Sequence, residues 1–297
     1  MPELPEVEVV RRGVDDWTTS RRIETVSVHH PRAVRRHLAG PQDFVGRLTG
    51  ALVRGTGRRG KYMWLDLDSG DLLVVHLGMS GQLRIVAPGT IADPHLRVRI
   101  GFADGRDELH FIDQRTFGAL FLDQPVGPDG VPSRIAHIAR DPFDPLFDAS
   151  EVTRRIRLSS SPIKALLLDQ NIVAGVGNIY ADEALWRSKI NWERPGRSLP
   201  TARVKHLLAN AAQVMTEALE VGGTSFDALY VNINGTSGYF SRSLVAYGQA
   251  GMPCPRCGTV IIRERFANRS SFRCPRCQRR SRRPVTGGGR AASSVGD

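Results

Sequence analysis

Two different periods of apolar and polar residues follow each other along this chain. Near the start, apolar residues recur every three or four positions, as on one face of a helix. This stripe comprises Leu4, Val7, Val10, Val14 and Trp17. It predicts an amphipathic helix whose first turn holds Pro2, Glu3 and Glu6.

From about residue 20 to residue 123 the period changes to two. In the run LRVRIGF, apolar residues from Leu96 to Phe102 alternate with arginines, and the Asp104-Gly105 pair predicts a hairpin turn into ELHFID. Similar short runs, separated by Gly, Asp and Ser, are IETVSVH, ALVRGT, YMWLDL, LLVVHLG and GALFLD. Together they predict an antiparallel sandwich or barrel.

The second half of the chain has a helical pattern. The Pro- and Gly-rich stretch from Gln124 to Ser133 indicates a boundary, and helices are predicted at about 150–156, 162–169, 179–187 and 201–220. We therefore expect an α+β protein with a β-sandwich domain at 1–123, a linker at 124–146 and a helical domain at 147–250. A cysteine module at 251–277 and a basic disordered tail at 278–297 would follow.

Composition limits the class of protein. The chain has 297 residues, of which 41% are hydrophobic, which is enough for two domains with their own cores. No run approaches eighteen uncharged apolar residues, and charged residues occur throughout the first thirty positions. We therefore expect neither a membrane span nor a secretory signal, and a cytoplasmic location.

Positive charge is concentrated at the C-terminal end. The formal net charge is +11, and nine of these charges lie in the last 44 residues. Such a concentration favours binding to a polyanion such as nucleic acid, although a solvated basic tail would have the same composition.

All four cysteines lie in one segment, as two Cys-x2-Cys pairs separated by sixteen residues: Cys254, Cys257, Cys274 and Cys277. This spacing predicts one structural Zn²⁺ held by four thiolates, with no open position for catalysis. The intervening residues can form two strands that leave Arg263, Arg265, Arg269 and Arg273 at the surface, available for phosphate.

A second dense motif is SSSPIKALLLDQNIVAGVGNIYADEALW. Its serines and Pro162 predict a helix start, the Gly175 and Gly177 pair a tight double turn, and Asn178 the cap of a second helix. A capped helix start suits an anion, and Lys164 adds a positive charge nearby. An ordinary αα-hairpin would have the same local pattern.

These motifs resemble those of the formamidopyrimidine-DNA glycosylase and endonuclease VIII family. The segment from Gln170 to Glu183 resembles the family's helix-two-turn-helix signature, PELPEVE its amino terminus, and the four-cysteine module its zinc finger. The likeness spans residues 2–277. It implies a monomeric bifunctional DNA glycosylase and AP lyase that removes oxidised purines, such as 8-oxoguanine and formamidopyrimidines, from damaged double-stranded DNA in base excision repair.

The resemblance also implies catalytic roles. Once Met1 is removed, Pro2 would be a free secondary amine that attacks the sugar and forms an iminium, with Glu3 as general acid. Lys61, in RRGKYMW, would assist, and Arg269 would donate a proton in the second elimination. Glu6 is expected to be a supporting acid.

Contacts with DNA are implied in the same way. Met79, Arg115 and Phe117 would fill the gap left by the extruded base, and His95 and Arg269 would contact the strand. Lys164 and Asn178, at the helix start described above, are also expected to contact DNA. Gln114 and Thr116 depart from the family's pattern around Arg115, where many members have proline and a second arginine. The glycine-rich stretch from Gly222 to Phe240 fits a lid over the base.

Several of these residues have ordinary alternative explanations. Without the resemblance, Met79 and Phe117 would be assigned to core packing and Lys61 to an exposed hairpin. Two other functions fit as well: an endonuclease VIII-like enzyme for oxidised pyrimidines, and a non-catalytic zinc-finger protein that only binds DNA.

Overall fold

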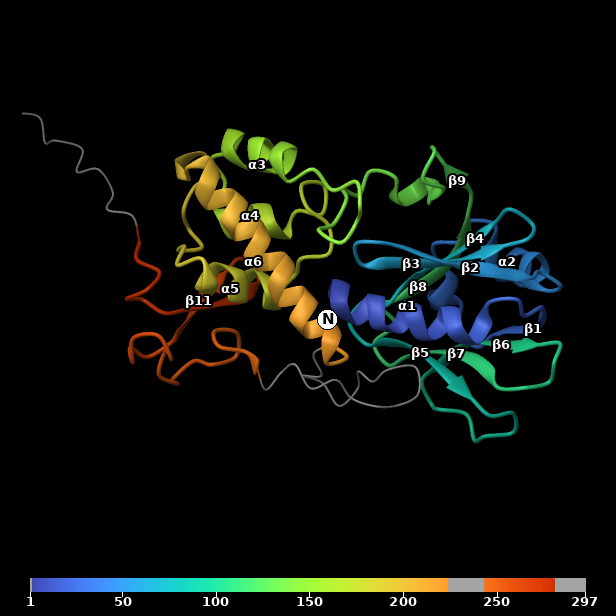
Figure 1. Cartoon of the computed structure of the whole chain (residues 1–297). Coiled ribbons are helices and arrows are strands. Elements are labelled where there is room, and N and C mark those ends of the chain that lie inside the picture. Colours follow the sequence, from blue (N-terminus) through green and yellow to red (C-terminus); the bar gives the residue numbers. More distant parts are fainter. Residues whose placement is uncertain (1, 224–242, 281–297) are drawn as a thin grey trace, which may run out of the picture.

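The computed structural model describes residues 2–223 and 243–280. Within these ranges the chain forms two lobes (Figure 1): a β-rich lobe built from the first half, and a helical lobe that carries the cysteine module. The N-terminal end of helix α1 (Leu4–Thr18) lies where the lobes meet.

The β-rich lobe contains two four-stranded antiparallel sheets, which confirms the predicted sandwich. The first sheet has the order β1-β6-β7-β5, with bounds Ile23–Val28, Leu96–Phe102, Glu108–Asp113 and Gly81–Val86. The second has the order β2-β3-β4-β8, with bounds Val53–Arg59, Tyr62–Leu67, Leu72–His76 and Ala119–Asp123. The predicted hairpin is the β6–β7 pair.

Helix α1 contributes its apolar stripe to the core of the sandwich. Val7, Val10 and Val14 pack with inward side chains of both sheets. Trp17 is 42% exposed and does not complete the stripe. It lies in the last turn of the helix, close to the C-terminal end at Thr18.

Three elements of this lobe were not predicted: strand β5, the short helix α2 (Gly40–Leu48) and the 3-10 turn η1 (Pro31–Val34). In α2 only Phe44 and Leu48 are buried, so its sequence shows no sustained apolar stripe. Strand β5 follows directly on the HLGMS turn, and the two could not be separated by pattern alone.

The connecting segment packs on the outer face of the second sheet. It contains the small hairpin of β9 (Pro125–Val126) and β10 (Val131–Pro132), followed by η2 (Ser133–Ile135). Val131, Ile135 and Ile138 bury the outer side chains Trp64 and Phe121. Both faces of this sheet are therefore covered.

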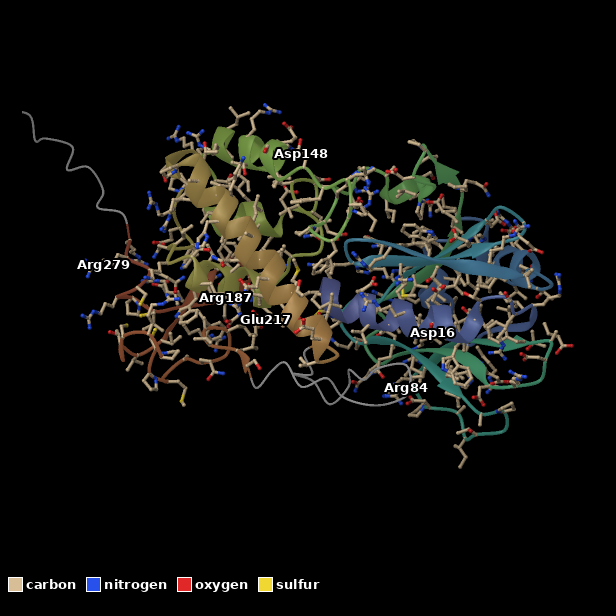
Figure 2. All side chains as sticks on the ribbon, in the orientation of Figure 1. Asp16, Arg84, Asp148, Arg187, Glu217 and Arg279 are labelled. Carbon is tan, nitrogen blue, oxygen red and sulfur yellow. The ribbon has the colours of Figure 1, made fainter. Side chains whose placement is uncertain are left out.

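The helical lobe consists of α3 (Ala149–Leu158), α4 (Ile163–Leu168), α5 (Asn178–Arg187), η3 (Gly196–Ser198) and α6 (Thr201–Glu220). Helices α3 to α6 agree with the predicted ones to within two residues at each end, whereas η3 was not predicted. Their apolar faces form one core, which also includes Leu4 of α1. At the surface, Arg187 of α5 pairs with Glu217 of α6 at 2.5 Å (Figure 2).

The cysteine module forms the predicted two-stranded hairpin of β11 (Ile262–Phe266) and β12 (Arg269–Arg273). Strand β12 contacts α5, so the module belongs to the helical lobe. Most of the predicted lid and residues 281–297 of the predicted tail lie outside the described residues. The predicted start of the tail at 278 is wrong, because Gln278 is buried and donates from its side-chain amide to the Ile190 carbonyl. Among the residues described, no helix combines the length and apolarity needed to cross a membrane.

Candidate active site

Glu3 joins the start of the chain to the helical lobe. It occupies the N-cap position of α1, and its carboxylate accepts hydrogen bonds from the backbone N–H groups of Ile179 (3.0 Å) and Tyr180 (3.4 Å) in the first turn of α5. The prediction that Asn178 caps α5 is therefore wrong: Gly177 occupies the cap position, and the Glu3 carboxylate serves as the capping group.

Two glycines allow this approach. A Cβ atom at Gly177 would lie 2.1 Å from the side-chain carboxyl carbon of Glu3, and one at Gly175 would lie 2.3 Å from a methyl carbon of Leu4. Gly175 also has φ of +85°, a conformation that L-residues rarely adopt. The double turn therefore receives the start of α1, and the Leu4 N–H donates to the Gly175 carbonyl at 3.1 Å.

Lys61 approaches the same turn from the opposite lobe. Gly60, at φ +57°, forms the tight β2–β3 turn, and the Lys61 Nζ donates to the Val176 carbonyl at 3.0 Å. Burial lowers the pKa of Lys61, while the carboxylates of Glu3 and Glu6 act in the opposite direction. Lys61 is thus part of the junction and not an exposed hairpin lysine.

The Glu3 carboxyl group is suited to hold a proton. The side chain is 2% exposed, and burial raises its pKa, against the opposing charge of Lys61. Glu6 adds to the rise through its negative charge, and its carboxylate accepts hydrogen bonds from the Glu3 N–H (2.9 Å) and the Tyr180 hydroxyl (2.6 Å). A buried carboxyl group with a raised pKa holds its proton more readily than an exposed one and is suited to act as a general acid.

A single cavity brings together residues from both lobes and the finger. Glu3, Met79, Asn178 and Arg269 all line it, so four of the predicted site residues converge. The side-chain amide of Asn178 donates to the Ser270 carbonyl at 3.0 Å, which joins α5 to the tip of the finger. Pro2, next to Glu3 in the chain, is buried.

Met79, Arg115 and Phe117 lie on two adjacent loops fastened by a buried carboxylate. One Asp113 oxygen accepts from the Ser80 hydroxyl (2.6 Å) and the other from the Gly118 N–H (2.7 Å). The Ser80 oxygen in turn accepts from the Arg115 N–H at 3.0 Å. Sequence reasoning did not identify Asp113 or Ser80.

These loops present their side chains to solvent. Met79 is 41% and Phe117 42% exposed, so neither is packed in the core, and the Arg115 guanidinium lies 4.9 Å from the centre of the Phe117 ring. Thr116 has φ of +51° between them. His95 is half-buried, and its carbonyl accepts from the Asp113 N–H at 2.9 Å, which places it beside the same loops.

Lys164 has a different environment from the one its sequence predicts. Its side chain is fully buried, pairs with Asp182 of α5 at 2.7 Å and donates to the Ser270 carbonyl at 3.3 Å. It therefore fixes the finger to the helical lobe, and its contact with DNA stays a prediction.

Two more buried carboxylates position the rim of the cavity. Asp182 also accepts from the Ser271 hydroxyl and the Phe272 N–H, both at 2.9 Å. Glu183, the next residue, accepts the N–H groups of residues 245–247. Both acids lie on a helix that is otherwise mostly apolar. A buried acid needs hydrogen-bond or charge partners, so acidic residues within this apolar segment were a signal in the sequence that could have identified them.

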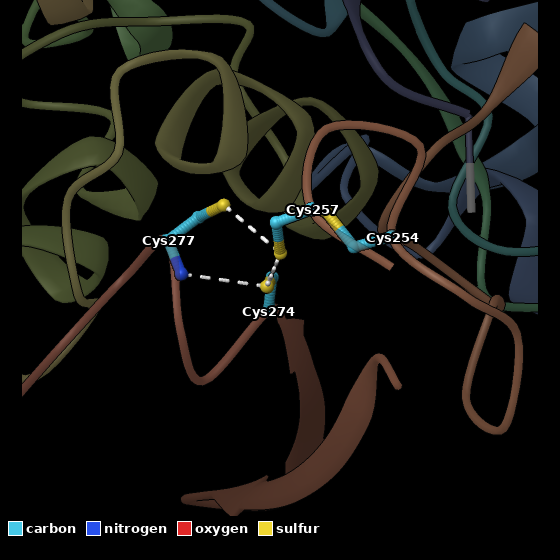
Figure 3. A group of neighbouring side chains, drawn as sticks. All are labelled: Cys254, Cys257, Cys274 and Cys277. Atoms are coloured by element: carbon cyan, nitrogen blue, oxygen red, sulfur yellow. Dashed lines mark hydrogen bonds between the residues drawn. The ribbon is translucent and has the colours of Figure 1, made fainter. Parts of the chain in front are cut away.

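The four cysteines converge at the base of the hairpin (Figure 3). Their sulfur atoms lie within 4.8 Å of one another, which fits one tetrahedral Zn²⁺ with four thiolate ligands. The Trp186 indole N–H donates to the Cys254 sulfur at 3.4 Å. The donor set leaves no position for substrate, so the zinc ion is structural.

The arginines of the finger are not all available to phosphate. Arg263, Arg265 and Arg269 are exposed, but Arg273 is 5% exposed and makes a two-fold hydrogen bond to Glu264 at 2.7 and 2.8 Å. The prediction that Arg273 lies at the surface is therefore wrong, because β12 turns that side chain inward.

Two predictions about this site fall partly or wholly on residues outside the described ranges. One is the removal of Met1, and the other is the lid between Gly222 and Phe240, of which only Gly222 and Gly223 are described.

Comparison with family models gives matches along most of the chain. The formamidopyrimidine-DNA glycosylase N-terminal domain matches residues 1–120, and the formamidopyrimidine-DNA glycosylase H2TH domain matches residues 138–229. A zinc finger found in FPG and IleRS matches residues 251–280.

Individual proteins and solved structures also match over nearly the whole chain. A Mycolicibacterium smegmatis protein named formamidopyrimidine-DNA glycosylase is 59% identical, with 96% of this chain and 99% of the relative covered. The Streptomyces coelicolor protein of that name is 56% identical over 94% and 98%. A Lactococcus lactis FPG mutant in complex with a Fapy-dG-containing DNA has a TM-score of 0.84 at 30% identity, with 94% and 100% covered.

Proposed function

The chain belongs to the formamidopyrimidine-DNA glycosylase family and is a DNA glycosylase of base excision repair, and we propose that it excises oxidised purines through a covalent bond from Pro2 to the sugar. The observation that carries this assignment is the position of Glu3. Its buried carboxyl group, next to Pro2 in the chain, lines the cavity that also receives Met79 and Arg269.

In the proposed reaction the Pro2 nitrogen uses its lone pair to attack C1′ of the damaged nucleotide. The bond from C1′ to the base breaks, and the base leaves with the proton that the Pro2 nitrogen gives up. Glu3 supplies a proton as the sugar ring opens, and the product is an iminium between Pro2 and C1′. Lys61, whose Nζ faces the same turn, stabilises negative charge that develops nearby.

Strand cleavage follows from the same intermediate. The iminium makes the proton on C2′ acidic, so its loss expels the 3′ phosphate, and a second elimination expels the 5′ phosphate. Arg269, exposed at the finger tip beside the cavity, is the proposed proton donor for this second step. We propose that the enzyme works as a monomer on DNA in the cytoplasm.

Recognition of the lesion site is assigned to the two exposed loops. Met79, Arg115 and Phe117 are proposed to occupy the space left by the extruded base, which explains why large apolar side chains remain exposed there. Asn178 and His95 are proposed to contact the strand on either side.

Borohydride trapping tests the covalent step. Incubating the protein with a duplex that carries 8-oxoguanine should give a trapped adduct, and Pro2→Gly and Glu3→Gln should abolish or strongly reduce it. Glu24→Gln, at an exposed position of β1, is the matched control and should trap normally. If the unsubstituted protein binds lesion DNA and gives no adduct, the protein is a binding module and the proposal is wrong.

The lesion class needs a separate comparison. Duplexes with 8-oxoguanine and with thymine glycol should be cut at different rates, with the purine lesion faster. Faster excision of the thymine glycol would assign the enzyme to the endonuclease VIII-like alternative.

The state of the N-terminus is tested by mass spectrometry. The intact mass of the purified chain should show that Met1 is absent, because retained Met1 would block the Pro2 amine.

A further inference from the structure

A second basic surface lies at the cysteine end of the finger. We call it the knuckle groove: it is lined by five cationic side chains and by Cys257 and Cys277. The cations are Lys189, Arg194, Arg256, Arg276 and Arg279. No acidic residue is among the described residues that line it.

The cations of the knuckle groove are not neutralised by carboxylates. Within residues 2–223 and 243–280, none of the five forms an ion pair, whereas Arg273 and Arg280 nearby both pair with Glu264. A zinc ion with four thiolates has a formal charge of minus two, which five cations exceed. The groove therefore has a net positive charge that no carboxylate of the described residues neutralises.

Three of the side chains are held in place by the protein. Arg256 lies 4.0 Å from the centre of the Trp186 ring and donates to the Trp186 carbonyl at 3.0 Å. Arg194 donates to the Ser198 carbonyl at 3.3 Å, and Arg279 to the Arg276 carbonyl at 3.3 Å. Cations that are already ordered lose less entropy when they bind an anion.

Lys189 occupies its position at an energetic cost. It follows Ser188, the C-cap of α5, and has φ of +53°, where glycine or asparagine is favoured. A left-handed conformation is unfavourable for an L-residue because its Cβ crowds the following carbonyl oxygen. A lysine at this position therefore brings a cation to the groove at the expense of helix-end stability.

The knuckle groove is separate from the candidate active site. Helix α5 has Asn178, which lines the cavity, at one end and leads to Lys189 at the other; its ten residues span about 15 Å. Strand β12 likewise runs from Arg269 at the cavity towards the cysteines, about 16 Å away. Figure 2 shows Arg279 at the end of the molecule remote from the β-rich lobe.

We propose that the knuckle groove binds the phosphate backbone of duplex DNA outside the lesion site. Four of its five cations are arginines, whose planar guanidinium group matches phosphate oxygens. Duplex DNA carries one negative charge per about 1.7 Å of its axis, so several cations about 15 Å from the lesion can each meet a phosphate. Such contacts are independent of sequence and would strengthen binding to undamaged DNA.

The salt dependence of binding tests this proposal. The variant Lys189→Gln/Arg276→Gln/Arg279→Gln should be compared with the unsubstituted protein on an undamaged duplex of about four helical turns, or about 42 base pairs. Each phosphate contact contributes about 0.9 to the slope of log affinity against log salt concentration. We expect the slope to fall by about two to three, with affinity at low salt reduced at least about tenfold.

A matched control removes the same charge elsewhere. Arg54, Arg106 and Arg154 are exposed and do not line the groove, and their triple replacement by Gln should change the slope by less than about one. An equal fall of the salt slope in both triple variants would refute the proposal, because the effect would then come from net charge alone. An unchanged slope in the groove variant would also refute it, because the groove would then make no contact with DNA.

Two further measurements separate this surface from the active site and from folding. The groove variant should retain one zinc ion per chain and should excise a lesion from a duplex of about one helical turn at the normal single-turnover rate. If the groove variant failed to excise the lesion from this short duplex while its salt slope on undamaged DNA was unchanged, the knuckle groove would not be a separate DNA-binding surface. Because the slope is measured on undamaged DNA, its outcome does not depend on the catalytic roles of Pro2 and Glu3.

The single substitution Lys189→Gly gives an independent check. Relief of the positive φ should raise the melting temperature, while loss of the cation should reduce the salt slope by about one. A variant that is more stable and binds long undamaged DNA as well as before would contradict a binding role for Lys189.

Discussion

At the scale of single residues, Glu3 combines two tasks that conflict. As the cap of α5 it accepts two backbone N–H groups, which favours its ionised form, yet burial favours its neutral form. Burial prevails, so the pKa rises. The same residue therefore orients the start of the chain and keeps a proton available next to Pro2.

The pH dependence of excision should report this balance. Glu3 acts as an acid, so the rate should fall as pH rises through its raised pKa. Lys61→Met removes a positive charge that lowers this pKa, and should move the alkaline limb to higher pH. Glu6→Gln removes a negative charge that raises it, and should move the limb to lower pH.

The measurement is the single-turnover excision rate as a function of pH, and the position of the limb is compared, not the maximal rate. If the alkaline limb of the pH–rate curve stayed in place in both variants, another group would be the acid. The same would follow if Lys61→Met moved the limb to lower pH and Glu6→Gln moved it to higher pH.

Gly177 should tolerate no side chain. The Cβ of Gly177→Ala would lie 2.1 Å from the Glu3 carboxyl carbon, so Glu3 must move and excision should fall by about 100-fold or more, the range of general-acid catalysis. Borohydride trapping and thermal unfolding measure the two effects. Gly46→Ala in α2, which has open space around it, is the control and should be neutral or stabilising by about 0.5–1 kcal/mol.

At the scale of elements, α5 organises the site because its ends and its buried face have different partners. Its first turn receives Glu3, Asp182 holds the finger, and Glu183 holds residues 245–247. A short helix thus holds three segments that lie far apart in the sequence. The finger does not stand free: Ser271 and Phe272 donate hydrogen bonds to Asp182 of α5, and the buried ion pair with Lys164 of α4 holds that carboxylate.

Removing one partner of that ion pair should be costly. Lys164→Met leaves Asp182 buried without its cation, and unfolding free energy should fall by about 3–5 kcal/mol. Affinity for lesion DNA should fall as well, because the finger loses the hydrogen bond from Lys164 to the Ser270 carbonyl, which is one of its attachments. Urea unfolding measures the first effect and binding the second.

The double variant Lys164→Met/Asp182→Asn is the informative comparison. It removes both charges while the amide oxygen can still accept from the Phe272 N–H, so it should lose less than the sum of the single changes. Additive losses would indicate that the pair contributes little and that packing alone fixes the finger.

At the scale of the whole molecule, α1 connects the two lobes. Its valines lie in the core of the sandwich, and Leu4 at its start lies in the core of the helical lobe. A second connection is electrostatic: Arg58 of β2 pairs with Glu8 of α1 (2.9 Å) and with Asp141 of the connecting segment (2.7 Å). Asp141 also accepts from the N–H of Gly60, next to Lys61.

This buried cluster should affect both stability and catalysis. Arg58→Met leaves Glu8 and Asp141 without their shared cation, and should cost about 3–5 kcal/mol of unfolding free energy and reduce excision by displacing the Lys61 turn. Arg12→Met removes an exposed partner of the same Glu8, and should cost less than about 1 kcal/mol. Similar small losses in both variants would show that the cluster does not hold the lobes.

The sequence by itself determined the elements and the metal site. The change of period from three or four to two, and back again, is a local property of the chain, and it predicted α1, seven of the eight sandwich strands and α3 to α6. Cysteine spacing predicted the zinc site because two close pairs need only one hairpin between them. The resemblance to a known family supplied the rest of the function.

Only the tertiary structure decided what each polar residue touches. Glu3 caps a helix 176 positions away, Lys164 is buried against Asp182, and Arg273 turns inward to Glu264. Local pattern places a residue on an element, but burial and pairing depend on which elements meet, and that is set by packing across the whole chain. The knuckle groove likewise exists because α5 and the finger bring together cations that are distant in sequence.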